Sequence, residues 1–304
     1  GYAVNRIATE VHDDLYTRVL AIEQDGIPYL LVQCDLIGVD DSVLNKVLDN
    51  LSDLHIKKEH LTIVATHTHA GPGGTVDTSK EPFSNLQNIF GKSNAEYLDF
   101  LSGQISLAAR KSFSDLKGCK LTVGRGKIEN VGTERHNPAL PGDDSLLVIL
   151  FERTDGKKVL LYNYACHPTI TGPENLMITA DFPYAVERDL SYDMIMFINS
   201  NAGNISTRFT RQSNGFGQVE LYKDHLINGI IDALKSPVYT GCFENFSMKR
   251  LPITLPIKKV RPVEVEEDAL RTHEKALAEA IAAGKDSLTI RLLSTYVEGG
   301  KIAV

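Results

Sequence analysis

The sequence has no apolar stretch long enough to cross a membrane as a helix, and it has no run of basic residues. The first absence predicts that the chain has no transmembrane segment. The second, together with a formal net charge of −7, argues against binding to nucleic acid. Internal repeats and low-complexity tracts are also missing. A chain of 304 residues with 42 % hydrophobic content is therefore expected to be an ordinary globular protein with a substantial core.

Cysteine is scarce, and none of the four cysteines forms a Cys-x-x-Cys pair. Cys34 and Cys166 lie in apolar, strand-like runs, where a reduced and buried thiol is expected. This usage favours a reducing compartment such as the cytoplasm. Secretion stays open as well, because the chain begins without methionine and a signal peptide can have been removed.

Strand and helix patterns alternate along the chain and predict an α/β fold, with mixed sheets, hairpins and flanking helices packed as a layered sandwich. Asp25-Gly26 predicts a hairpin between two strand-like segments. Strands are expected at 15–23, 27–36, from 61, 119–128, 145–152, 158–165, 194–199 and within 240–260. Helices are expected at 40–54, 94–113, 182–190, 217–235 and 263–283. A further strand is expected to begin at Gly300–Val304.

Two histidines end an apolar, β-branched segment, Leu61-Thr-Ile-Val-Ala-Thr-His-Thr-His-Ala-Gly-Pro-Gly-Gly74. Side chains two residues apart on a strand share a face, so His67 and His69 are expected to point together from the strand end. Converging imidazoles indicate a metal site, or one ligand beside a proton-transfer group. A pair of hydrogen-bonded structural histidines is the alternative, because a bare His-x-His motif is weak.

Two other strand ends carry candidate site residues. The strand that begins at Val159 ends near His167 and a proline, and the strand 194–199 leads into a turn that contains Ser206. Strands that end at one sheet edge would bring three imidazoles together, as a zinc ion with an open position for water requires. Ser206 does not lie in a Gly-x-Ser-x-Gly motif, so a turn serine is the alternative to a nucleophile.

Other hydrolases with a His-x-His motif fit less well. Metallo-β-lactamase-like enzymes need an aspartate two residues after the second histidine, where this chain has Gly71. Amidohydrolase barrels need a regular eightfold repeat of strand and helix, which the sequence lacks. Neither class is therefore retained.

Five segments resemble, in order and approximate spacing, the neutral/alkaline (non-lysosomal) ceramidase family. They are Ala65-Thr-His-Thr-His-Ala-Gly-Pro-Gly-Gly74, Thr133-Glu-Arg-His-Asn-Pro138, Asn163-Tyr-Ala-Cys-His-Pro-Thr169, Thr179-Ala-Asp-Phe-Pro183 and Asn201-Ala-Gly-Asn-Ile-Ser206. The resemblance covers roughly residues 1–250, the amino-terminal part of the family's catalytic domain. It implies a ceramidase-like catalytic domain over residues 1–260. Residues 261–304 are expected to add a helical extension and the start of a further strand of the same domain.

The resemblance implies a zinc-dependent amidase that splits an N-acylsphingosine into a fatty acid and a sphingoid base. By motif, His67 and His167 are implied zinc ligands, and His69 sits beside the metal as a proton-transfer or hydrogen-bonding group. Arg135 is implied to lie near the substrate carbonyl, and Ser206 to act as nucleophile or to position the substrate. The residues expected to support this site are Asp35, Asp181 and Asn204.

Amide hydrolysis needs a nucleophile, a polarised carbonyl and a proton for the leaving amine. Zinc can supply the first two, and a neutral His69 can move the proton. Arg135 and the backbone amides near Ser206 can stabilise the oxyanion. Attack by an activated water is favoured over acylation of Ser206, because no general base is visibly paired with that serine.

Several features separate this chain from the family. The Pro-Gly-Glu and Gly-Tyr motifs that complete the family's zinc site do not occur, so either the chain is a fragment of a longer protein or its site is built differently. The unpaired strand expected at its end favours a fragment. Asn204 stands where the family has aspartate. An amidase for another acyl conjugate and a noncatalytic metal-binding relative remain alternatives. The expected partner is a lipid or small-molecule amide, with contact at a membrane surface possible, and the loop 75–94 is a candidate wall of an acyl-chain groove through Phe83, Leu86, Ile89 and Phe90.

Overall fold

The computed structural model describes residues 6–77, 79, 92–242, 246–254 and 261–303. Its strands are β1 (Glu10–Val11), β2 (Thr17–Gln24), β3 (Ile27–Cys34), β4 (Leu61–Ala65), β5 (Cys119–Lys127), β6 (Thr133–Glu134), β7 (Ser145–Arg153), β8 (Lys158–Tyr164), β9 (Met177–Ile178), β10 (Met194–Asn199), β11 (Ile205–Ser206) and β12 (Tyr239–Gly241). Its α-helices are α1 (Asp41–Asn50), α3 (Ala95–Ser114), α4 (Phe182–Asp189), α5 (Phe216–Lys235), α6 (Val263–Ala282) and α7 (Ser287–Ala303), and short 3₁₀ turns lie at Ser52–Leu54, Lys58–His60 and Ala202–Asn204.

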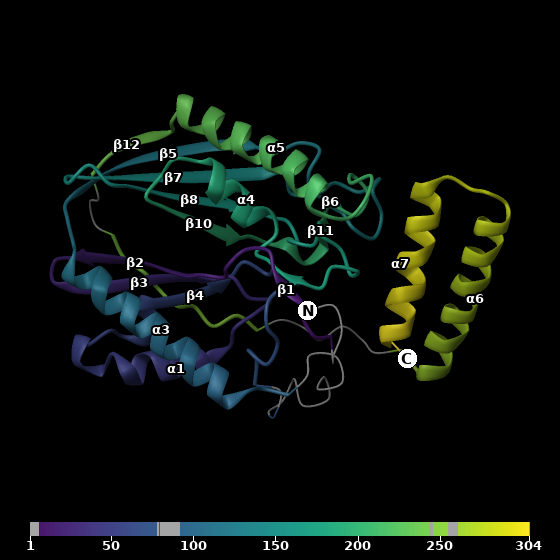
Figure 1. Cartoon of the computed structure of the whole chain (residues 1–304), viewed down its shortest axis with the longest axis horizontal. Coiled ribbons are helices and arrows are strands. Elements are labelled where there is room, and N and C mark those ends of the chain that lie inside the picture. Colours follow the sequence, from purple (N-terminus) through teal and green to yellow (C-terminus); the bar gives the residue numbers. More distant parts are fainter. Residues whose placement is uncertain (1–5, 78, 80–91, 243–245, 255–260, 304) are drawn as a thin grey trace.

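Two sheets form the middle of the molecule (Figure 1). The smaller has the strand order β2-β3-β4, and the larger has the order β10-β8-β7-β5-β12. Strands β2 and β3 form the hairpin predicted from Asp25-Gly26, while β4 runs parallel to β3 and β10 runs parallel to β8. Helices α1 and α3 cover the smaller sheet, and α4 and α5 cover the larger one. The predicted layered α/β sandwich with mixed sheets is therefore confirmed. Its four layers are α1 and α3, the smaller sheet, the larger sheet, and α4 and α5.

Strand β8 is buried on both faces, which explains why its sequence is apolar without alternation. Leu160 and Tyr162 pack toward α4 and α5, whereas Val159 and Leu161 face the other sheet. The cluster between the sheets also contains the fully buried Met196 of β10 and, packed against it, residues of β2 and β3. A strand buried on both faces needs apolar side chains at every position. The sheets therefore share one core, and their ends are fixed relative to each other.

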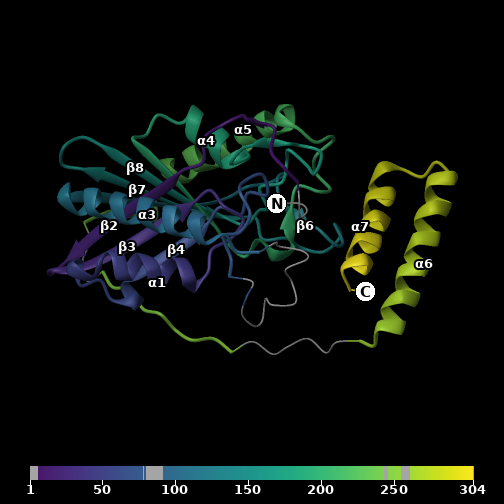
Figure 2. The same cartoon turned by 60° about the horizontal axis from the view of Figure 1, so that its bottom comes forward.

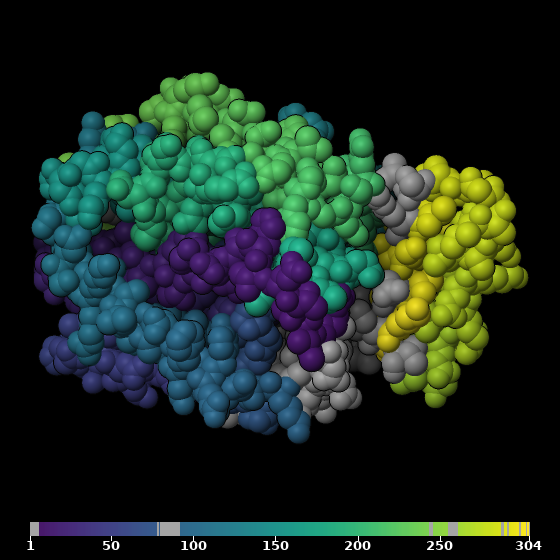
Figure 3. Space-filling view, in the orientation of Figure 1, coloured from purple at the N-terminus to yellow at the C-terminus, as the bar shows by residue number. Residues whose placement is uncertain are grey.

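Helices α6 and α7 form a hairpin beside the sandwich (Figures 1 and 2). The guanidinium of Arg208 donates a hydrogen bond to the hydroxyl of Thr295 on α7, which ties this hairpin to the rest of the chain. Figure 3 shows the hairpin packed at one end of the molecule. Across the described ranges, no helix has both the length and the apolar character needed to span a membrane.

Two predictions for the carboxyl-terminal part are wrong. Residues 300–303 continue α7 and do not begin a strand. A Cβ at Gly300 would lie 3.0 Å from Cδ1 of Leu270, so this glycine allows α6 and α7 to pack closely and does not end the helix. Within the segment 240–260, the described residues form a strand only at β12, because 246–254 have no regular hydrogen-bonded partner strand.

Candidate metal centre

His67 lies in the loop that follows β4, whereas the sequence predicted that it lies at the end of the strand itself. The strand ends at Ala65, and His67 has a φ of 72°, in the left-handed region that non-glycine residues seldom adopt. Two bonds hold it there: its backbone amide donates to the Leu36 carbonyl at 2.9 Å, and its Nδ1 lies 2.6 Å from the Ile37 carbonyl oxygen. Because Nδ1 donates to that carbonyl, the Nε2 atom carries the lone pair.

His167 is held in the same manner by a different part of the chain. Strand β8 ends at Tyr164, and the buried His167 follows three residues later. The Ile205 carbonyl accepts from the His167 backbone amide at 3.0 Å and from Nδ1 at 2.9 Å. The ring therefore also carries its lone pair on Nε2. Backbone carbonyls that fix Nδ1 in this way are the usual outer support of a histidine that binds a metal.

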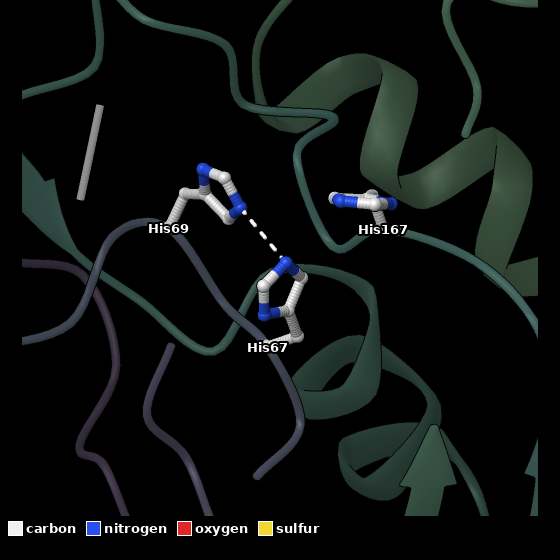
Figure 4. A group of neighbouring side chains, drawn as sticks. All are labelled: His67, His69 and His167. Atoms are coloured by element: carbon white, nitrogen blue, oxygen red, sulfur yellow. Dashed lines mark hydrogen bonds between the residues drawn. The ribbon is translucent and has the colours of Figure 1, made fainter. Parts of the chain in front are cut away.

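The three histidines predicted from the sequence come together in space (Figure 4). Nε2 of His69 lies 3.3 Å from Nε2 of His67, and one nitrogen from each of the three rings lies within 4.8 Å of the others. The His67 ring is nearly perpendicular to the His69 ring, at 86°. The rings thus converge through their edges, as ligands around one point do, and not by stacking.

Burial keeps these imidazoles neutral. Removal from water lowers the pKa of His167 to about 4 and the pKa of His69 to about 2, and it also lowers the pKa of His67. The guanidinium of Arg135 lowers all three pKa values further, and the neighbouring rings lower those of His69 and His167. A neutral imidazole is the form that binds a metal ion. The cluster is therefore a candidate metal site on its chemistry as well as its geometry.

Arg135 borders the cluster. Its backbone amide donates to the Asn204 carbonyl at 2.8 Å, and one guanidinium nitrogen lies 3.3 Å from Nε2 of His167. The buried carboxylate of Glu134 accepts bonds from the backbone amides of His136 and Asn137, which fixes the turn that carries the arginine. The Nε atom of Arg135 is buried with no hydrogen-bond partner in the described chain. A half-buried, incompletely satisfied cation beside the histidines is suited to an anionic group.

Ser206 is buried next to Ile205, the residue that anchors His167. It lies in the two-residue strand β11, opposite Thr133 of β6. Its hydroxyl accepts a hydrogen bond from the backbone amide of Arg208 at 3.3 Å. The hydrogen bonds described for this hydroxyl include no histidine, so the structure pairs no base with it. Asn204 is exposed, and it contributes its backbone carbonyl to Arg135.

Asp35 and Asp181 are buried, and their carboxylates accept hydrogen bonds from the protein's own donors. Asp35 accepts from the guanidinium of Arg18 at 2.8 Å and from the Gln33 side chain at 2.7 Å. It thereby holds the turn whose next two carbonyls bind His67. Asp181 caps α4 and also accepts from Thr171, and burial raises the pKa of its carboxyl.

The sequence analysis missed Asp13, a buried carboxylate that supports the histidine loop. Asp13 accepts from the Thr179 hydroxyl at 2.5 Å and from the Ala180 amide at 2.8 Å. The Thr179 carbonyl in turn accepts from the Thr68 hydroxyl at 2.8 Å, between the two histidines. No motif surrounds Asp13, and its partner is 166 residues away in the sequence, so no local pattern could indicate this role.

The proposed acyl-groove residues at 83, 86, 89 and 90 lie outside the described residues.

A family model and two solved structures relate the chain to known proteins. A family model described as neutral/alkaline non-lysosomal ceramidase, N-terminal, matches residues 1–209. Among solved structures, a ceramidase complexed with C2 and the neutral ceramidase from Pseudomonas aeruginosa are both similar, at 21 % identity over 80 % of this chain, with TM-scores of 0.69 and 0.68. The chain spans 42 % and 43 % of their lengths. No curated protein sequence matches significantly.

Proposed function

Because the chain belongs to the neutral/alkaline non-lysosomal ceramidase family, we propose that it forms the histidine-bearing part of a zinc-dependent hydrolase of N-acyl amides. The substrate we propose is a ceramide, cleaved to a fatty acid and a sphingoid base. The observation that carries this proposal is the convergence of His67, His69 and His167 from two different sheets.

The donor set fits a zinc ion. His67 and His167 both commit Nδ1 to a backbone carbonyl and leave Nε2 for a ligand, and both rings are neutral. The short approach of His69 Nε2 to His67 Nε2 brings together two nitrogens that a cation would stabilise. Because a backbone carbonyl fixes both of these rings, we assign His67 and His167 as ligands. We assign His69 as their neighbour, as the family motif implies. A bound zinc ion would polarise the scissile carbonyl and acidify a water molecule.

The chain's own groups complete the chemistry. Arg135 can bind the carbonyl oxygen as negative charge develops on it, because its half-buried guanidinium already lies at the edge of the cluster. His69 lies beside the assigned ligands, and we propose that it carries a proton to the leaving amine, because the lowered pKa of its ring makes the protonated form a ready donor. Within the described part of the chain no base is hydrogen-bonded to the Ser206 hydroxyl, which supports a role in holding the substrate rather than in forming an acyl-enzyme.

Metal analysis of the purified chain tests the cofactor. We expect about one equivalent of zinc in the wild-type protein and less than half an equivalent in His67→Ala and His167→Ala. His225→Ala is the control, because this exposed residue lies on α5. Equal zinc contents in the wild-type protein and the ligand variants would overturn the assigned site.

Release of amine from a panel of N-acyl substrates tests the reaction. We expect turnover of ceramide that is lost on treatment with a chelator and restored by zinc. Turnover of another acyl conjugate without turnover of ceramide would retain the amidase and reject the sphingolipid substrate. A protein that binds zinc stoichiometrically but cleaves no member of the panel would be a noncatalytic relative.

A further inference from the structure

Asn199 is the last residue of β10 and lies between the two histidine segments. Its side-chain Nδ2 donates to the Thr66 carbonyl at 3.0 Å and to the Cys166 carbonyl at 3.0 Å. Its Oδ1 accepts from the Cys166 backbone amide at 3.3 Å. Both N–H donors and the oxygen of this half-buried amide are therefore used.

The two carbonyls that accept from Asn199 immediately precede His67 and His167. One belongs to the segment that follows β4 of the three-stranded sheet, and the other to the segment that follows β8 of the five-stranded sheet. A single side chain thus joins the two sheets at the point where each supplies an imidazole. Because a change of about 1 Å in ligand position weakens a metal site, this link controls a sensitive distance.

We propose that Asn199 is a positioning residue that sets the separation of the His67 and His167 rings for metal binding. The proposal rests on the proposed function, since it concerns the same metal site. It adds a residue on β10, a strand that supplies none of the three histidines.

The chemistry of the amide explains why asparagine is required. Aspartate has the same shape, but it would place an anionic oxygen against the two carbonyl oxygens that now receive N–H groups. That oxygen would repel both carbonyls and separate the segments. Alanine would remove all three bonds and leave both carbonyls without this partner.

Asn163 offers a matched control. It is a half-buried asparagine on β8, and its Nδ2 donates to the Ile198 carbonyl of β10 at 2.8 Å. This bond joins β8 to β10, as one of the Asn199 bonds joins β10 to the segment after β8, but it makes no link to the segment after β4. Asn163→Ala therefore tests the loss of a β8–β10 bond without loss of the link between the histidine segments.

The experiment measures zinc affinity by competition with a chromophoric chelator, together with the melting temperature of the metal-free proteins. We expect Asn199→Asp and Asn199→Ala to bind zinc at least tenfold more weakly than the wild-type protein. Asn163→Ala should bind zinc within twofold of the wild-type affinity, even if its metal-free melting temperature falls as much as those of the Asn199 variants.

The outcomes separate the two proposals. Wild-type zinc affinity in both Asn199 variants would overturn the positioning role and leave the proposed function intact. A wild-type protein that binds no zinc would overturn both. If both Asn199 variants fail to fold, or if Asn163→Ala loses zinc affinity equally, the amide supports the sheets in general and the positioning role is wrong.

Discussion

The Nδ1 atoms of His67 and His167 are both engaged by backbone carbonyls, so each ring has its orientation before a ligand arrives. Such preorganisation lowers the conformational entropy that ligand binding would otherwise cost. It also requires an unusual backbone at His67, whose left-handed φ costs on the order of 1–3 kcal/mol and is offset by its two hydrogen bonds. Strain of this kind is typical of functional sites.

Arg135 gives a prediction that separates catalysis from metal binding. Its guanidinium donates to Nε2 of His167, the nitrogen assigned to the metal, so it must release that nitrogen when the site is loaded. We therefore expect Arg135→Met to leave zinc affinity unchanged or higher. Loss of the oxyanion donor should lower kcat by roughly 10²–10³-fold.

The measurements are chelator competition for zinc affinity and initial rates of amine release for kcat. Asn137→Ala is a control that should keep kcat within a few fold, because it keeps the backbone amide that binds Glu134 and removes only a side chain that accepts from the Ala139 amide. A tenfold loss of zinc affinity in Arg135→Met would mean that the arginine supports the metal ligands, contrary to this prediction.

At the scale of elements, the contact between β5 and α5 depends on one glycine. A Cβ at Gly124 would overlap the Ala233 carbonyl and lie 2.6 Å from its carbon atom, whereas a Cβ at Gly126 would lie 3.5 Å from Cβ of Ala233. We expect Gly124→Ala to destabilise the protein by about 1–3 kcal/mol, since the helix must move away from the sheet. Gly126→Ala should change stability much less. Urea unfolding of both variants measures the difference, and equal midpoints would contradict the close contact.

Helices α4 and α5 are joined by a charged network that makes stability depend on pH. Hydrogen bonds from Arg188, and then from Lys223, lower the pKa of Asp189 and of Glu220 to about 2. A carboxylate with a lowered pKa in the folded state stabilises that state above its unfolded pKa, and this stabilisation is lost as pH falls. The network should therefore act fully above pH about 4.5 and fade toward pH 2.

Glu220→Gln tests this network. We expect the variant to melt about 1–3 °C below the wild-type protein at pH 7, because partly exposed ion pairs contribute about 0.2–1 kcal/mol. The difference should shrink as the pH is lowered from about 4.5. Asp232→Asn, on the exposed face of the same helix, is the control and should show a smaller difference. A gap that is constant from pH 7 to pH 3 would show that Glu220 acts by packing and not by charge.

Local patterns predicted most elements, because their causes are local. The helices predicted at 40–54 and 94–113 begin where Asp40 and Asn94 cap α1 and α3, by accepting hydrogen bonds from the backbone amides of Ser42 and Tyr97. The order of strands in the two sheets could not be predicted, since it depends on contacts between distant segments. The two-residue pairing of β6 with β11 is equally nonlocal, and it is this pairing that sets Arg135 beside His167.

In the candidate site, too, features with local causes could be predicted and those fixed by distant segments could not. The residue types and strand ends predicted the convergence of three histidines, which the structure contains. The left-handed backbone at His67 and the bridge through Asn199 were not predictable, because each is fixed by bonds to another strand. The individual roles of Ser206, His69 and Arg135 stay predictions.

In the whole molecule, the candidate metal centre lies where the two central layers meet. His67 extends from the three-stranded sheet and His167 from the five-stranded sheet, and these sheets already share a buried core that includes Met196. A ligand that binds both histidines therefore connects the two halves of the sandwich. Because it binds only the folded state, it stabilises the entire molecule and not one loop.

Zinc at a hundredfold excess over its dissociation constant should therefore stabilise the fold by about 2.7 kcal/mol. For a chain of this length we expect the melting temperature to rise by roughly 5 °C, in a single transition, because the shared core couples both sheets. Calorimetry with zinc and with a chelator measures the change. His167→Ala should abolish the rise, whereas His225→Ala, on the exposed face of α5, should retain it. Two transitions, of which zinc moves only one, would mean that the sheets unfold separately and that the metal is held by a single layer.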